Sequence, residues 1–363
     1  MKKVGIVGAG QLGLMLGEAA AAVGAECRFL DPADNPPAAR VGEVVKRAYD
    51  DAEALAELAA WADVITYEFE NVPVAAVEAV ADAVPVYPPP MALRNAQDRL
   101  NEKRLFETLD IPTSPFRNIE SAEDVLSAAA ELGLPLVFKT RRLGYDGKGQ
   151  AVVRDAEELE DLWSTLGEVP LMAEQFVDFD REVSVIGSRR VNGEIVTWPL
   201  TENRHAGGIL RVSLAPYEDA ALLEAGADYH RRMLEHLDYI GTMALEMFVV
   251  GDQLVANEFA PRVHNSGHWT IEGAETSQFE NHLRAVLDLP LGDTAAQGYS
   301  VMVNLIGTMP DDLDDAVERG YALHDYGKSP RPGRKLAHIT AVSDSVAGRD
   351  SATEQLLALP GVS

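Results

Sequence analysis

The chain has 363 residues, of which 47% are hydrophobic and 25% are charged, as in a globular protein large enough for two or three domains. Its formal net charge of −27 argues against nucleic acid as a partner, because a phosphate backbone requires a basic binding surface. The single cysteine, Cys27, excludes a disulfide framework and fits a reducing compartment, so we expect a cytoplasmic protein.

The N-terminal third alternates short β-branched strands with helices, which indicates a Rossmann-like α/β domain. The apolar stretch that follows Lys2 and Lys3 is interrupted by glycines, Gln11 and Glu18, so we expect neither a signal peptide nor a membrane protein. The expected strands span 3–7, 26–30 and 64–67, and the expected helices span 11–23 and 52–60.

A glycine-rich loop, Gly8-Ala9-Gly10-Gln11-Leu12-Gly13, joins the first expected strand to the first helix and matches the dinucleotide-binding pattern G-x-G-x-x-G. Asp31 ends the second strand, about where an acid that binds ribose is expected. A nicotinamide-dependent oxidoreductase is therefore one alternative, and tight binding of NADH would support it. The pattern is weak, because any phosphate or carboxylate at a helix N-terminus can use this backbone geometry. No later segment supplies a hydride-transfer site.

The middle of the chain is predicted to form a lid over nucleotide phosphates. After helices at 97–109 and 121–132, an apolar strand at 136–139 ends in Lys139 and leads into a glycine-rich loop, Gly144–Gln150. Glycines let backbone N–H groups close over phosphate oxygens, and the nearby cations offset their charge. A mobile hairpin is the alternative, but cations gathered in so acidic a chain favour the lid. Further strands are expected at 151–153 and 171–174.

Two strands at 243–250 and 253–259 are predicted to form a β-hairpin around Gly251 and Asp252. With a loop of three residues, Glu246 lies opposite Glu258, and both carboxylates point to the same face. Two like charges side by side require a cation between them, and Mg²⁺ binds one or two carboxylates together with phosphate oxygens. A solvent-facing acidic hairpin is the alternative, which the apolar neighbours of both residues disfavour. Asn257 adds an amide beside the two carboxylates, and we call Glu246, Asn257 and Glu258 the platform.

A basic cluster, Lys328, Arg331, Arg334 and Lys335, is the densest group of cations in the chain. Because clustered cations repel one another unless an anion binds between them, we expect an anionic ligand here. A solvated turn is the alternative. Strands at 299–306 and 337–342 flank the cluster and are expected to form a small barrel-like subdomain after residue 291.

These motifs resemble those of the ATP-grasp superfamily. Within it, four segments together resemble the N5-carboxyaminoimidazole ribonucleotide synthetase family, the ATPase subunit of phosphoribosylaminoimidazole carboxylase. The resemblance runs from about Lys3 to about His338, which is nearly the whole chain. The four segments are Gly144–Gln150, Glu202–His205, Ala260–Trp269 and Arg331–Lys335.

The resemblance implies an enzyme of purine biosynthesis that uses ATP and Mg²⁺. ATP would phosphorylate bicarbonate to carboxyphosphate, whose carboxyl group the amine of 5-aminoimidazole ribonucleotide captures. It also implies a homodimer and a mutase that takes the product. The nearest competitor among the ligases transfers formate to glycinamide ribonucleotide, and a nucleotide-binding subunit without catalysis is a further alternative.

The resemblance also assigns roles to residues of this chain. Catalytic roles fall to Arg262, Lys139, Tyr145, Asp146 and His264, with Arg262 stabilising negative charge at the carboxylating centre. Asp146 helps to orient the amine or only caps the lid turn, and His264 and His268 are alternatively core histidines. Glu246 and Glu258 would bind Mg²⁺. The nucleotide would contact Arg99, Lys139, Gly144, Tyr145, Asp146, Gly147, Lys148, Gly149, Gln150, Glu174, Gln175, Phe176, Val177, Glu182, His205, Asn257 and Glu258. The ribonucleotide would contact Gln11, Leu12, Asn265, Ser266, Lys328, Arg331 and Arg334.

The fold implied is an ATP-grasp fold of mixed α/β and α+β class. We expect a Rossmann-like pre-ATP-grasp domain at 1–96, and a linker helix with the lid domain at 97–180. A C-terminal ATP-grasp domain with the Mg-ATP site follows at 181–290, and an extension at 291–363 completes the substrate site.

Overall fold

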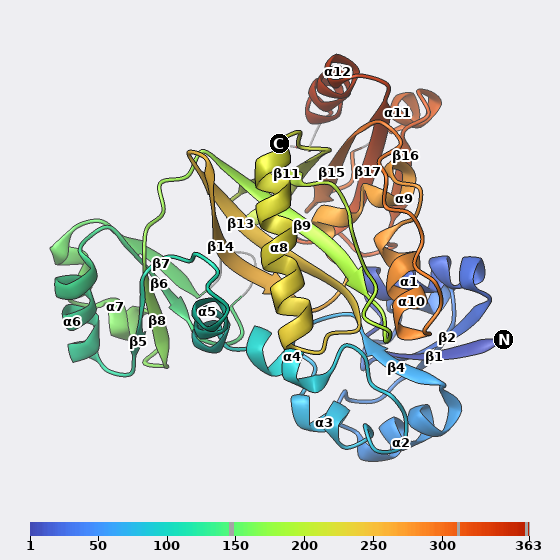
Figure 1. The fold of residues 1–363 in the computed structure, drawn as a ribbon, viewed down its shortest axis with the longest axis horizontal. Helices are drawn as coiled ribbons and strands as arrows, with labels where there is room; N and C mark the ends of the chain where they lie inside the picture. Colours follow the sequence, from blue (N-terminus) through green and yellow to red (C-terminus); the bar gives the residue numbers. More distant parts are fainter. Residues whose placement is uncertain (145–148, 311–312, 360–361, 363) are drawn as a thin grey trace.

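The computed structural model of the protein describes residues 1–144, 149–310, 313–359 and 362, whose strands form three sheets. Figure 1 shows a small sheet at the left, an N-terminal sheet at the lower right, and a large sheet between and above them. Tyr145, Asp146, Gly147 and Lys148, which were predicted to belong to the lid loop, lie outside the described residues. None of the helices in the described ranges combines the length and hydrophobicity of a membrane span.

The N-terminal sheet is parallel, with strand order β3-β2-β1-β4, as alternating strands and helices predict. Buried side chains such as Val4, Ile6 and Phe29 pack it against α1. The predicted elements are confirmed, although the helix expected at 11–23 ends as a 3-10 turn before left-handed Gly24. The elements are β1 (Lys2–Val7), α1 (Gln11–Ala19), β2 (Ala25–Leu30), β3 (Glu43–Val45), α2 (Ala52–Trp61), β4 (Val64–Tyr67) and α3 (Val74–Glu78).

Two helices, α4 (Pro90–Ala96) and α5 (Arg99–Thr108), lead from this sheet to the rest of the chain. Helix α5 begins later than the predicted residue 97, because the Asp98 side chain accepts a hydrogen bond from Leu100 N and caps the helix. Its next turn carries Glu102 and Lys103, which are both buried.

The small sheet is antiparallel, with strand order β5-β8-β6-β7, and we call it the lid sheet. Ile119, Phe138 and Ala173 pack against Val125 of α6, whose first turn is capped by Ser121. The predicted strands at 136–139, 151–153 and 171–174 and the helix at 121–132 are confirmed. The elements are β5 (Phe116–Ile119), α6 (Ala122–Leu132), β6 (Leu136–Thr140), β7 (Gln150–Val153), α7 (Leu162–Thr165) and β8 (Leu171–Gln175).

The large sheet follows the path β14-β13-β9-β11-β12-β15-β17-β16, with β10 paired to β9. Helix α8 covers one face of its β13–β14 end, and α10 packs between β13 and the N-terminal helix α1. Its strands are β9 (Arg181–Arg189), β10 (Ile195–Thr197), β11 (Thr201–Ala206), β12 (Ile209–Ala215), β13 (Gly241–Val250), β14 (Gln253–Ala260), β15 (Tyr299–Ile306), β16 (Ala322–Asp325) and β17 (Lys335–Ser343). The helices are α8 (Ala220–His236), α9 (Thr270–Gly273), α10 (Gln278–Val286), α11 (Asp314–Glu318) and α12 (Val346–Leu357).

The prediction of a separate barrel-like subdomain after residue 291 is wrong. Strand β15 pairs with β12, and β17 pairs with β15, so this segment extends the large sheet. The strands themselves were predicted at the right positions. Their placement differs because β12 would otherwise leave an unpaired edge, and the apolar face of β15 and β17 is covered by α12 instead of by a closed barrel.

Candidate active site

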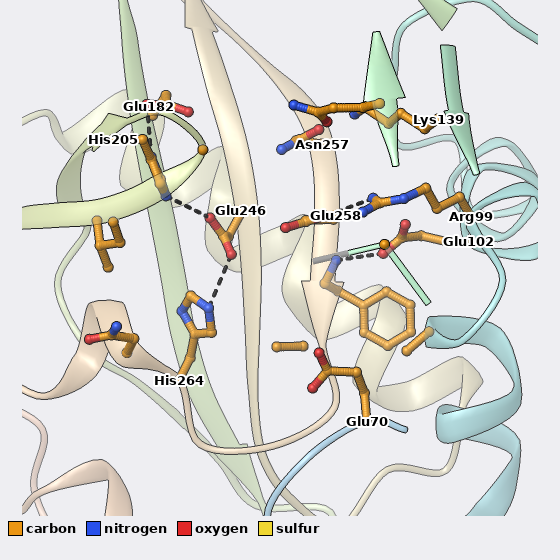
Figure 2. Close-up of a pocket in the computed structure, with 18 of the residues that line it drawn as sticks. Glu70, Arg99, Glu102, Lys139, Glu182, His205, Glu246, Asn257, Glu258 and His264 are labelled. Carbon is orange, nitrogen blue, oxygen red and sulfur yellow. Dashed lines mark hydrogen bonds and ion pairs between the residues drawn. The ribbon is translucent and has the colours of Figure 1, made fainter. Parts of the chain in front are cut away.

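The site is a cavity of about 700 Å³ between the lid sheet and the large sheet, with one wall from the N-terminal domain. Figure 2 shows part of its lining. The structure brings together here most of the predicted site residues that it describes. Those in the wall are Gln11, Leu12, Arg99, Lys139, Gly144, Gln150, Glu174, Gln175, Phe176, Val177, Glu182, His205, Glu246, Asn257, Glu258, Arg262, His264 and Asn265.

The predicted pairing of Glu246 with Glu258 across the β13–β14 hairpin is confirmed, but the predicted loop of three residues is wrong. Val250 pairs with Gln253, so the turn holds two residues. A β-bulge beside Glu246 restores the offset by leaving Asn257 as the extra residue on β14. Because a bulge re-aims side chains, Asn257 and Glu258 both line the cavity although they are neighbours in the chain.

Glu246 lies between two histidines, as Figure 2 shows. Its Oε1 is 3.1 Å from His264 Nε2, and its Oε2 is 4.0 Å from His205 Nε2. Burial opposes ionisation of Glu246, but His264 and His205 hold its pKa well below the usual range. His205 Nδ1 also lies 2.9 Å from Glu182 Oε2, and these carboxylates raise the pKa of His205 despite its burial.

Glu258 forms an ion pair with Arg99, whose Nη1 is 2.9 Å from Glu258 Oε2. Beside them is Glu102, which sequence reasoning missed as a site residue. Its Oε1 accepts a hydrogen bond of 2.7 Å from Phe259 N, while burial and the charge of Glu258 raise its pKa to about 8. The only sequence signal was the charge-rich helix 97–109, which did not reveal the buried face.

The donor set of the platform fits Mg²⁺. Glu246, Glu258 and Asn257 present oxygen ligands, which hard cations prefer. Among residues 1–144, 149–310, 313–359 and 362, no group of three or more histidine, cysteine or acidic side chains is arranged to hold a metal ion. The described residues therefore supply no complete protein cage, which suits Mg²⁺ because it takes one or two carboxylates and fills its other positions with phosphate oxygens and water.

Lys139, one residue before the end of β6, forms an ion pair with Glu174 on the neighbouring strand β8. Glu174 also binds Lys103, whose Nζ is 3.0 Å from Glu174 Oε2. Burial opposes ionisation of Glu174, but the two lysines hold its pKa well below the usual range. The carboxylate thus has partners other than the adenine or ribose that the family resemblance implies. Lys103, which is 1% exposed, was not predicted.

An aromatic pair in the cavity wall was also missed. The rings of Phe179 and Phe248 stack with centroids 4.5 Å apart and planes at 11°. Phe248 follows Glu246 on the same face of β13, whereas Phe179 comes from the loop before β9. Their distance in the chain left no sequence signal for the contact.

Arg262 contacts the N-terminal domain through an ion pair with Glu70, in the segment that follows β4. Burial opposes ionisation of Glu70, yet Arg262 lowers its pKa to about 2. Asn265 lies nearby in the same wall and is 8% exposed. Within the described residues, neither polar atom of its side-chain amide has a hydrogen-bond partner. A buried amide of this kind needs a partner, and the cavity offers room for one.

The glycine-rich loop after β1 already holds anions that belong to the protein. Glu68 accepts hydrogen bonds from Gly10 N and Gly13 N, each of 2.6 Å. Asp31 accepts one of 2.9 Å from Ala9 N. A Cβ on Gly10 would lie 2.6 Å from Glu68 Oε1, so glycine is needed for this contact. The oxidoreductase alternative therefore loses the backbone groups that would bind a dinucleotide phosphate.

A second cavity of about 490 Å³ adjoins this loop and includes Lys328 and Arg334 from the predicted basic cluster. Lys328 donates a hydrogen bond to Gln11 Oε1, and burial lowers the pKa of its amine to about 8. Glu68 lines both cavities, so they are neighbours.

Three predicted contacts lie outside the two cavity linings. Ser266 is buried behind His264, where its Oγ lies 2.9 Å from His264 Nδ1 and 2.8 Å from Ser184 Oγ. Gly149, in the part of the glycine-rich loop that the structure describes, and Arg331 line neither cavity. His268 is fully buried, but within the described residues neither of its ring nitrogens has a hydrogen-bond partner, so it differs from the core histidine with satisfied hydrogen bonds that is the alternative for this position.

Comparisons with known proteins cover nearly the whole chain. Profiles match the ribonucleotide synthetase preATP-grasp domain at residues 1–97, the ATP-grasp domain at 104–279, and the phosphoribosylaminoimidazole carboxylase C-terminal domain at 300–360. The N5-carboxyaminoimidazole ribonucleotide synthase of Pseudomonas aeruginosa is 48% identical over 338 residues, which cover 93% of this chain and 94% of the relative. That of Bacillus subtilis is 38% identical, with 93% and 90% covered.

Comparison with solved structures points to the same family. The N5-carboxyaminoimidazole ribonucleotide synthetase of Thermus thermophilus matches with a TM-score of 0.94 at 50% identity, covering 98% of both chains. The synthase of Aspergillus clavatus, solved with ADP and 5-aminoimidazole ribonucleotide, matches with a TM-score of 0.90 at 31% identity, covering 98% of this chain and 97% of the other. The chain therefore belongs to the N5-carboxyaminoimidazole ribonucleotide synthetase family of ATP-grasp ligases.

Proposed function

We propose that this chain carboxylates 5-aminoimidazole ribonucleotide with ATP and bicarbonate, giving N5-carboxyaminoimidazole ribonucleotide, ADP and phosphate in purine biosynthesis. The observation that carries the proposal is the carboxylate pair Glu246 and Glu258 in the wall of the cavity under the lid sheet. Phosphoryl transfer depends on positioning and on neutralising phosphate charge, which this platform serves. The names of the relatives and the Aspergillus clavatus complex support the substrate.

Glu246 and Glu258 would hold Mg²⁺, with Asn257 beside them. Bound there, the ion would neutralise charge on the phosphate oxygens as the phosphoryl group moves. Arg99, Lys139, Lys148 and His205 would contact the phosphates. Because Arg99 is paired with Glu258 in this structure, it would exchange that carboxylate for phosphate when the nucleotide binds. The segment Glu174–Val177 and Glu182 would hold adenine and ribose, next to Phe179 and Phe248.

The reaction centre would lie between Arg262, His264 and Asn265, with Tyr145 and Asp146 contributed by the lid. Arg262 would stabilise negative charge on the activated carboxyl group. Carboxyphosphate is easily hydrolysed, so the lid has to exclude water when the nucleotide is bound. The two unpartnered polar atoms of Asn265 support a ligand at this position.

The ribonucleotide phosphate would bind Lys328, Arg331 and Arg334, with Gln11 and Leu12 beside it. Lys328 and Arg334 of this cluster line the second cavity, and their positive side chains support an anion there. We further propose the four units at 1–96, 97–180, 181–290 and 291–363, a cytoplasmic homodimer, and a mutase that takes the product.

The test is to measure ADP formation from ATP, Mg²⁺ and bicarbonate, with and without 5-aminoimidazole ribonucleotide, while the carboxylated product is assayed in parallel. We expect the ribonucleotide to stimulate ADP formation strongly and the product to match it. Because the chain is so acidic, the assay is run at low and at multimolar salt. If a folded sample shows no stimulation at either salt concentration, the proposed substrate is contradicted, and glycinamide ribonucleotide with formate would then be tested.

A further inference from the structure

The strand pair β15–β17 has two buried faces of opposite character. Val301, Val303 and Ile339 pack on one face against α12. The other face points toward the segment Asn265–Gly273, which includes α9. It carries polar side chains that are at most 1% exposed, and we call this face and the facing segment the polar layer. Its strand residues are Ser300, Asn304, His338 and Thr340.

The polar layer concentrates unpaired hydrogen-bonding groups. Thirteen buried side-chain nitrogen and oxygen atoms have no hydrogen-bond partner within the described ranges, and nine of them lie here. Each such group loses its hydrogen bonds to water without gaining others, so a folded protein is not expected to tolerate nine together. The nine atoms belong to Asn265, His268, Glu272, Ser300, Asn304, His338 and Thr340.

Water is the ligand that fits these atoms. Burial holds the pKa values of His268 and His338 well below the usual range, so both rings are neutral and each has one donor and one acceptor nitrogen. Amide and hydroxyl groups complete the set, and water can satisfy donors and acceptors alike. A metal ion does not fit, because the described side chains include no suitable cluster of metal ligands.

A series of contacts connects the polar layer to the reaction cavity at one end and to partly exposed side chains at the other. It begins at Asn265 in the cavity wall, where His268 N donates a hydrogen bond of 3.1 Å to Asn265 O. The His268 and His338 rings are 4.7 Å apart, and His338 stacks on His324 at 4.4 Å. His324 Nε2 is 2.6 Å from Glu272 Oε1, and these two side chains are 21% and 24% exposed.

We propose that the polar layer holds a chain of ordered water molecules through which a proton leaves the closed reaction cavity for solvent. The inference rests on the proposed function. The lid sheet and the β16–β17 edge lie at opposite sides of the molecule (Figure 1), so closing the lid leaves this route open.

The proposed reaction needs such a route, because at neutral pH it releases one proton per turnover. Bicarbonate forms an oxygen–phosphorus bond as the bond from ATP to its γ-phosphoryl group breaks, and the bicarbonate hydroxyl loses its proton. The amine then forms a nitrogen–carbon bond to carboxyphosphate, phosphate leaves with the bonding electrons, and the amine proton goes to that phosphate. The bicarbonate proton is the one that the polar layer would carry away.

The experiment follows a single turnover of the full chain by stopped flow, with a pH-indicator dye for the proton and quenched samples for the product. In the unaltered protein, we expect the proton to reach solvent together with product formation. In His338→Ala, we expect the proton to appear about tenfold later or more, together with phosphate release. Imidazole should restore the early proton, whereas pyrrole, which donates but does not accept, should not.

His230→Ala is the matched control, because His230 is also fully buried but lies on α8 outside the polar layer. Thr340→Val tests the water without changing side-chain volume, and it should also delay the proton while lowering thermal stability. If the polar layer held no water, the Thr340 hydroxyl would be unsatisfied, and its removal would instead raise the thermal stability of the protein. The inference is overturned if His338→Ala and Thr340→Val form product and release the proton as the unaltered protein does. Absence of product in the unaltered protein would instead overturn the proposed function.

Discussion

The glycine loop Gly8–Gly13 and the β13–β14 hairpin both have the sequence features of a phosphate site, but the structure treats them differently. In the loop, Glu68 already accepts hydrogen bonds from the backbone N–H groups of Gly10 and Gly13. In the hairpin, Glu246 and Glu258 line a cavity of about 700 Å³ and form ion pairs with histidine and arginine side chains that are not part of a backbone loop. A motif supplies geometry, and the charges around it decide whether an external anion can bind.

The largest effect is expected from Glu258→Gln, which keeps the shape of the hairpin but removes half of its negative charge. Without the charge, the proposed Mg²⁺ ion loses a ligand, so we expect ATP hydrolysis and carboxylation to fall together by about a thousandfold or more. Initial rates of ADP and product formation measure this. Glu57→Gln, at an exposed position of α2, is the charge-matched control, and retention of either activity by Glu258→Gln would contradict the metal assignment.

A second prediction concerns the lid, where Gly149 has φ +70° and a Cβ would lie 2.6 Å from Thr140 Oγ1. Gly149→Val should therefore disturb closure, so that carboxyphosphate is hydrolysed before the amine captures it. We expect phosphate release to exceed product formation several-fold. Gly133→Val, at a lid glycine of φ +75° with open space around its Cβ position, controls for backbone strain. Equal loss of both products in a folded Gly149 variant would contradict the role.

Glu68→Gln tests the glycine loop Gly8–Gly13, the region that was compared with the hairpin. Because the neutral amide is a weaker acceptor for Gly10 N and Gly13 N, we expect the free energy of unfolding to fall by about 1–3 kcal/mol. Chemical denaturation measures this change, and isothermal titration with NADH tests the loop as a dinucleotide site. Tight NADH binding by the unaltered protein would revive the oxidoreductase alternative.

At any one pH unit the effect expected from Glu102→Gln, beside the hairpin, is small, and it depends on pH. Burial and Glu258 raise the pKa of Glu102 from 4.5 to about 8, so the folded protein keeps a proton that the unfolded chain loses. The stability from this proton is fully present below pH 4.5 and is lost as the pH rises to about 8. In the unaltered protein this makes the free energy of unfolding fall by up to about 1 kcal/mol for each pH unit in that range. The variant has no such proton, so its free energy of unfolding should lose this dependence on pH. Unfolding curves at several pH values measure it, and an unchanged slope would contradict a raised pKa.

Many of the helices and strands were predictable from the sequence, because local patterns determined them. Alternating strands and helices gave correct elements, and the pairing of Glu246 with Glu258 was correct even though the two-residue turn and the bulge at Asn257 were not foreseen. The family resemblance supplied many residues of the cavity wall, but not Glu102, Phe179 or Phe248.

What could not be predicted depends on contacts between distant segments. Glu68 binds a loop 55 residues earlier in the chain, and Glu70 pairs with Arg262 across 192 residues. Burial, which determines the state of Glu102 and Lys103, has no signature in a charge-rich helix. The extension of the large sheet by β15 and β17 likewise followed from the free edge of β12, which the strand pattern does not reveal.

The most direct test of the central claim is a crystal structure with Mg²⁺ and a non-hydrolysable ATP analogue, without the ribonucleotide. We predict that the triphosphate lies between the lid sheet and the β13–β14 hairpin, with Mg²⁺ on Glu246 and Glu258, while Glu68 still binds Gly10 N and Gly13 N. A triphosphate bound at the backbone N–H groups of Gly10 and Gly13, with Glu68 displaced, would contradict the account.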